Sequence, residues 1–139
     1  CTVGNNDSSG TTNDWGSINF GTYADLANII DGSVLGSDGS SSVTVTCTSG
    51  LSPTLTLDGG LNGSSTLRNM TSGTTLIPYR LYSDSSRSTE IAVNGSGSLS
   101  ADGTAKDVPI YGRILPSDQS TTAPASGTYV DTVTATLAW

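Results

Sequence analysis

The sequence contains no histidine, a single glutamate (Glu90) and few charged residues, which make up 12% of its 139 positions. Without an imidazole the chain cannot form a Ser-His-Asp or Cys-His triad, a histidine-bearing zinc site or the usual general base near neutral pH. Paired carboxylates for glycoside hydrolysis would need two acids facing one cleft, and the aspartates stand mainly in turn sequences. We therefore expect no catalytic residue, no metal site and no cofactor, and we predict that the protein is not an enzyme.

Positive charge is also scarce, because five Lys and Arg residues oppose twelve acidic residues and leave a net charge of −7. Nucleic-acid binding requires a basic surface, and an anionic membrane attracts clustered basic residues. The five cations are scattered along the chain, so they provide neither. No apolar run approaches the ~18 residues of a membrane helix. These observations exclude nucleic acid as a partner and predict no membrane insertion.

Serine, threonine and glycine take the place of the missing charges, in a composition that suits β-strands joined by tight turns. A chain of this length buries roughly two-thirds of its unfolded surface, so we expect a single domain over residues 1–139. Seven runs have the length or the apolar–polar alternation of a strand. They are residues 17–20, 43–47, 54–57, 76–82, 90–93, 106–115 and 129–139.

The segments between these runs are typical of turns and loops. Asp58-Gly59 and Asn94-Gly95 are strong turn dipeptides. Residues 4–14 and 31–42 are predicted loops, and residues 23–30 have at most the pattern of a turn or two of helix. About seven short strands at this spacing predict an all-β fold, a β-sandwich.

The last run has the clearest alternation. Val133, Ala135, Leu137 and Trp139 share one parity, while threonines at 132, 134 and 136 share the other. This pattern is typical of a strand with one buried face and one face in water.

The sequence contains two cysteines, Cys1 and Cys47. A disulfide is the simplest use of the pair, and it would place the protein in an oxidising compartment. Closing a loop of this length stabilises the fold by roughly 4 kcal/mol in the chain-entropy model. Two free buried thiols and a lipid-anchored Cys1 remain alternatives.

The aromatic residues could form a sugar-binding platform, although most of them lie inside strand runs, where core packing explains them. Trp15 stands among polar residues and is the best candidate for an exposed ring.

Several segments, taken together and in order, resemble the spore coat protein U domain family, which includes the pilins of archaic chaperone–usher pili in Gram-negative bacteria. The most specific segments are Tyr-Arg-Leu-Tyr-Ser-Asp at 79–84, Ile-Tyr-Gly-Arg at 110–113 and Gly-x-Tyr-x-Asp-Thr-Val at 127–133. The similarity extends over nearly the whole chain.

This resemblance implies an incomplete immunoglobulin-like sandwich that lacks its last strand. A periplasmic chaperone would lend the missing strand, and the N-terminal extension of a neighbouring pilin would replace it at the outer-membrane usher. The resemblance also implies a Cys1–Cys47 disulfide. It implies that Ile18 and Phe20, on one flank, and the last strand, on the other, line a donor-strand groove. The four groove residues expected on the last strand are Val133, Ala135, Leu137 and Trp139.

The expected function is therefore that of a structural pilus subunit, polymerised by donor-strand exchange and supporting surface attachment and biofilm formation. The protein would pass through the periplasm and end in an extracellular pilus. Because the sequence begins at the cysteine, we expect an acceptor body without its own donor segment. The alternative is a receptor-binding module, a tip adhesin or lectin-like domain; the chain's end at Trp139 favours a shaft subunit.

Overall fold

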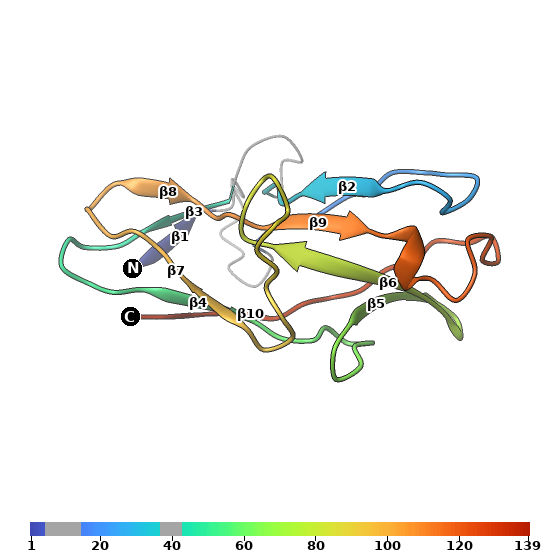
Figure 1. Ribbon diagram of the computed structural model, residues 1–139. Helices are drawn as coiled ribbons and strands as arrows, with labels where there is room; N and C mark the ends of the chain where they lie inside the picture. The colour runs from blue at the N-terminus through green and yellow to red at the C-terminus, as the bar shows by residue number, and fades with distance from the viewer. Residues whose placement is uncertain (5–14, 37–42) are drawn as a thin grey trace.

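In the part of the chain that the structure describes, the regular elements are antiparallel strands and one turn of 3-10 helix (Figure 1). The computed structural model describes residues 1–4, 15–36 and 43–139. The elements are β1 (Thr2–Gly4), β2 (Ile30–Ser33), β3 (Thr44–Thr46), β4 (Thr54–Leu57), β5 (Arg68–Ser72), β6 (Thr75–Tyr82), β7 (Ser96–Ser98), β8 (Ala105–Asp107), β9 (Tyr111–Ile114), η1 (Pro116–Asp118) and β10 (Ala135–Ala138).

These strands form three sheets, with the orders β2-β9-β6-β5, β1-β3-β8 and β10-β4-β7. The first two sheets continue one another, because hydrogen bonds join Val34 to Ile110 and Val108 to Val43 between the named strands. Together they form one layer, and β10-β4-β7 forms the other (Figure 1). The architecture is all-β and consistent with an immunoglobulin-like β-sandwich, as the sequence predicts.

Alternating side chains build the core between the layers. In β4, Leu55 and Leu57 are buried while the threonines beside them are only partly so. In β6, Ile77, Tyr79 and Leu81 are buried on one parity. Such alternation follows from the two-residue period of a strand, which sends successive side chains to opposite faces.

Several predicted strands differ in length or position from those in the structure. The runs at 17–20 and 90–93 are wrong as strands, since each retains only an isolated bridge, at Ser17 and at Glu90. The run at 106–115 divides into β8 and β9, and the run at 129–139 is a regular strand only in β10.

The segment 23–30 contains no helix, and the predicted loop at 31–42 begins with strand β2 instead. Residues 37–42 of that loop, like residues 5–14, lie outside the described part of the chain. Ile30 is buried in β2 opposite Ile114, so its tertiary partner on β9 overrides the weak local helix pattern.

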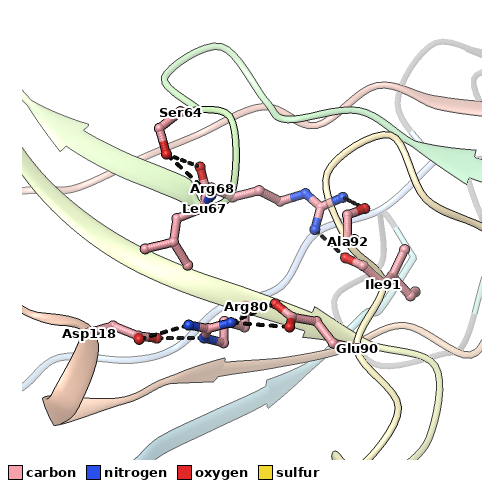
Figure 2. Close-up of polar contacts among 8 residues, drawn as sticks. All are labelled: Ser64, Leu67, Arg68, Arg80, Glu90, Ile91, Ala92 and Asp118. Atoms are coloured by element: carbon pink, nitrogen blue, oxygen red, sulfur yellow. Dashed lines mark hydrogen bonds and ion pairs between the residues drawn. The ribbon is translucent and has the colours of Figure 1, made fainter.

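The outer face of the four-stranded sheet is polar, and three arginines are paired there. Arg113 donates to Asp31 on the neighbouring strand, and this hydrogen bond lowers the pKa of the Asp31 carboxyl below its usual value. Arg80 lies between Glu90 and Asp118, as Figure 2 shows. Arg87 donates to the carbonyls of Gly32 and Gly112 and lies over the Tyr111 ring. These arginines hold loops and strands to the sheet.

Cys1 and Cys47 form a disulfide across a sequence separation of 46 residues. Cys47 is buried in the core, and Thr2 pairs with Thr46 in the adjoining strands. The bond therefore fastens the start of the chain to the end of β3, which is the arrangement that the family resemblance implies.

Candidate functional site

A groove with a volume of about 800 Å³, lined mostly by apolar residues, lies between the segment 15–20 and the C-terminal segment 129–135. Its walls include Ile18 and Phe20 on one side and Val133 and Ala135 on the other. Core side chains of both layers form its floor. These are Val34, Val43, Leu57, Met70, Tyr79, Leu81, Val108 and Ile110.

The C-terminal wall of the groove is a sheet edge. Strand β10 pairs with β4 and stands at the end of its sheet among the described strands. The carbonyls of Thr132 and Thr134 accept hydrogen bonds from Leu61 and Asp58, so both face the β4 side. Backbone groups alternate sides along a strand, and those of Val133 and Ala135 therefore point away from β4.

Leu137 follows the same pattern as Val133 and Ala135. Leu55 and Leu57 direct their amides to β7, as the Leu57 bond to Gly95 shows, which leaves Thr54 and Thr56 to bond β10. Leu137 and Ala135 of β10 are opposite Leu55 and Leu57, so their N–H and C=O groups lie on the side of β10 that faces away from β4. The edge and the inward apolar side chains are provided by the same residues.

The structure brings together four of the six predicted groove residues: Ile18, Phe20, Val133 and Ala135 line the groove. Leu137 is partly buried against the core, beyond the groove lining. Trp139 lies outside the groove and is 63% exposed, because it follows the last residue of β10 and has no partner on β4. Its parity predicted a buried ring, but the strand ends before it.

Two facing glycines make room for Phe20. Gly32 and Gly112 are opposite one another in the β2–β9 pair. A Cβ on Gly112 would lie 2.7 Å from the Phe20 ring, and a Cβ on Gly32 would lie 2.8 Å from Ile18. The missing side chains allow Ile18 and Phe20 to pack directly on the sheet, where Phe20 also approaches Tyr79.

The groove residues that were not assigned to it from the sequence include Trp15, Tyr79 and Asp131. Trp15 is partly buried and packs against the core, so it is not the exposed ring that its polar neighbours predicted. The sequence did contain a pattern that could have identified Asp131, because this residue has the same parity as Val133, Ala135 and Leu137. An acid on the inward face of a strand requires donors, and these come from distant segments.

Asp131 is held by three donors from three positions. The Tyr79 hydroxyl donates to Oδ2 at 2.5 Å, while the Leu61 amide and the Asn62 side chain donate to Oδ1 at 3.0 and 3.2 Å. Burial raises the pKa of the Tyr79 hydroxyl well above its ordinary value, and the hydrogen bond to Asp131 raises it further. Tyr79 therefore stays a proton donor throughout the neutral range.

The raised pKa of the Tyr79 hydroxyl predicts that the protein loses stability at alkaline pH. Since the folded state keeps the proton while the unfolded tyrosine releases it near pH 10, this contribution is present below pH 10 and is lost as the pH rises further. We expect the difference in unfolding free energy between the parent and Tyr79→Phe to shrink by up to about 1.4 kcal/mol per pH unit above pH 10. Urea unfolding at pH 8 to 11 measures it, and a difference that stays constant would contradict the expectation.

A buried arginine lies next to Leu57, one of the residues of the groove floor. The Arg68 side chain, 2% exposed, donates to the carbonyls of Asp58, Leu57, Ile91 and Ala92. Figure 2 shows its guanidinium directed at Ile91 and Ala92. Burial lowers the pKa of Arg68, yet the group keeps its charge because arginine titrates far above neutral pH. Arg68 thereby ties the end of β4 to the segment 91–92.

The described residues provide no constellation for chemistry on a bound group. Among them, no three His, Cys, Asp or Glu side chains gather in a way that could hold a metal ion. Within those same ranges, no helix is both long and apolar enough to cross a bilayer. The groove presents many apolar side chains beside a strand edge that is unpaired among the described strands, and such a combination can bind an extended segment by adding it to the sheet.

The two-layer fold, the disulfide and the groove define an all-β, disulfide-bonded module in which a groove lies beside a sheet edge. Residues 1–136 match the Spore Coat Protein U domain, so the chain belongs to that family, the family of archaic chaperone–usher pilus subunits. The resemblance drawn from the sequence segments is confirmed. No curated protein matches the sequence.

Membership makes the protein a pilus subunit of the chaperone–usher type, in a family that is structural rather than enzymatic. The family is assembled through the periplasm into extracellular pili, with a chaperone, an usher and other subunits.

Proposed function

We propose that this protein is a structural subunit that polymerises by donor-strand exchange and thereby supports surface attachment and biofilm formation. The groove is the acceptor site. A periplasmic chaperone fills it first, and the N-terminal extension of a neighbouring subunit replaces that strand at the outer-membrane usher.

One observation carries the proposal: the groove's apolar wall and the free backbone edge belong to the same residues. Val133 and Ala135 direct their side chains into the groove and their backbone groups away from β4. An added strand would pair with these backbone groups and place alternate side chains in the groove. Each large apolar side chain buried there contributes roughly 1.5–3 kcal/mol. An empty groove with such an edge favours aggregation, which explains the need for a chaperone.

The position of Trp15 supports this role over a receptor-binding platform. Its indole lines the groove and packs against the core, so it is engaged by the acceptor site. Trp15 was the best candidate from the sequence for the exposed ring of a sugar-binding platform.

A charge in the groove wall should abolish acceptor activity. In Ala135→Asp, a donor strand would bury an unpaired carboxylate, at a cost of several kcal/mol. We expect the parent to bind a synthetic peptide that carries the donor segment of a full-length family subunit, and Ala135→Asp to lose at least about a hundredfold in affinity. Calorimetry or fluorescence anisotropy measures the binding.

The matched control is Thr136→Asp, which places the same charge on the exposed face of the same strand. This variant should bind the peptide like the parent. Failure of the parent to bind, or equal binding by Ala135→Asp and Thr136→Asp, would overturn the acceptor role.

A further inference from the structure

We propose that Asp131 and Tyr79 are positioning residues, and that their hydrogen bond sets the spacing between the edge strand and the opposite sheet at one end of the groove. This inference rests on the proposed acceptor function and adds to it the means by which the groove is kept open and in register before a donor strand arrives.

Asp131 is the one acid in an inward-facing row that continues with Val133, Ala135 and Leu137. Its carboxylate crosses from the C-terminal segment to Tyr79 on β6, a strand of the other layer, at 2.5 Å. The residues on either side are held by their backbones: Val130 pairs with Thr71 on β5, which lies beside β6 in the same sheet, and the Thr132 carbonyl accepts from Leu61. Asp131 thus adds a side-chain link to β6 at the point where the backbone partners of the C-terminal segment change from β5 to the residues that follow β4.

The surrounding loop is shaped around this carboxylate. Gly60 has a φ of 75°, and a Cβ at that position would collide with Asp131 Oδ2. The next two residues supply donors, through the Leu61 amide and the Asn62 side chain. Asn62 is itself linked onward, since its carbonyl accepts from Asn69 in β5. The loop at 60–62 leaves room for the Asp131 carboxylate at Gly60 and donates two hydrogen bonds to it, so it fixes the position of this carboxylate.

The link acts on the acceptor site because both of its members line the groove. The backbone of Asp131 has the same orientation as that of Val133, away from β4, so it belongs to the edge that an incoming strand would pair with. Holding this segment in place removes part of the ordering cost of binding. Without the link, the Val130–Thr71 pair remains, but the segment between that pair and β10 has more freedom to move relative to β6 and must be ordered again when a donor binds.

The test compares two substitutions that remove one hydroxyl each. Tyr79→Phe breaks the link between the layers. Tyr129→Phe is the matched control, because Tyr129 also lines the groove but donates at 2.6 Å to Ala125, four residues away in its own segment. Both variants are titrated with the synthetic donor-segment peptide at a temperature well below the unfolding transition of each. Amide hydrogen exchange of residues 130–134 is followed without peptide.

We expect Tyr79→Phe to bind the peptide about tenfold more weakly than the parent and to exchange the amides of 130–134 faster, and Tyr129→Phe to stay within roughly twofold of the parent. Asp131→Asn added to Tyr79→Phe should cost less affinity than Asp131→Asn alone. If the parent binds and Tyr79→Phe binds equally well, with only a lower melting temperature, Tyr79 is merely structural and the inference is wrong. If the parent itself does not bind, the acceptor function fails and the inference fails with it.

Discussion

Removing the disulfide, as Cys1→Ala/Cys47→Ala, is expected to destabilise the protein by about 4 kcal/mol. The bond closes a loop across 46 residues, and in the chain-entropy model its loss releases that constraint on the unfolded chain. Alanine keeps the buried position of Cys47 apolar, so the cavity left by one sulfur adds little. For a chain of this length we expect the melting temperature to fall by about 14 °C. Calorimetry or circular dichroism measures the change.

Reduction provides an internal control, since the sequence contains only these two cysteines. A reductant should lower the melting temperature of the parent by a similar amount and leave the double variant unchanged. Thiol labelling of the unreduced, denatured parent should modify neither cysteine. Labelling of both, or a loss of less than about 1 kcal/mol in the variant, would refute the stabilising role of the bond.

Replacing Arg68 with methionine is expected to cost about 3–5 kcal/mol of stability. The substitution preserves most of the apolar stem but removes every donor, so the carbonyls at positions 57, 58, 91 and 92 lose their partner in a buried region. Arg68→Lys should fall between the parent and Arg68→Met, because an ammonium has the charge but not the planar fork that reaches several acceptors. Urea unfolding measures all three proteins.

Arg113→Met is the matched control for Arg68→Met. Arg113 pairs with Asp31 on the outer face of the sheet, and such exposed ion pairs contribute about 0–1 kcal/mol. Equal losses in the two methionine variants would show that the network around Arg68 has no special weight. A decrease in the urea m-value of Arg68→Met would instead indicate that the native state has loosened.

Part of the fold could be read directly from local pattern. The run at 54–57 is strand β4 without change of bounds, and the alternation at 133–137 correctly separates partly buried from exposed positions. The weaker patterns were less informative. Residues 23–30, where the sequence allowed at most a turn or two of helix, contain none, and β5 and β7 were absent from the predicted strands, since Arg68–Ser72 and Ser96–Ser98 show no apolar alternation. These strands exist through their partners on β6 and β4.

The candidate site was also only partly predictable from the sequence. The groove positions of Ile18, Phe20, Val133 and Ala135 were available from parity together with the family resemblance. That Trp139 is exposed depends on where the pairing of β10 with β4 ends, which its parity does not state.

By itself the sequence determined that no histidine-based chemistry is available, which single intramolecular disulfide two cysteines permit, and the faces of the strongest strands. These depend on residue identity and on a two-residue period, both of which are local. Only the tertiary structure decided that Arg68 is buried among carbonyls, that Asp131 reaches Tyr79 across the layers, and that the edge of the last strand faces a groove. Each of these depends on register and partners brought together from distant parts of the chain, because a buried polar group is stable only where the fold supplies its hydrogen bonds.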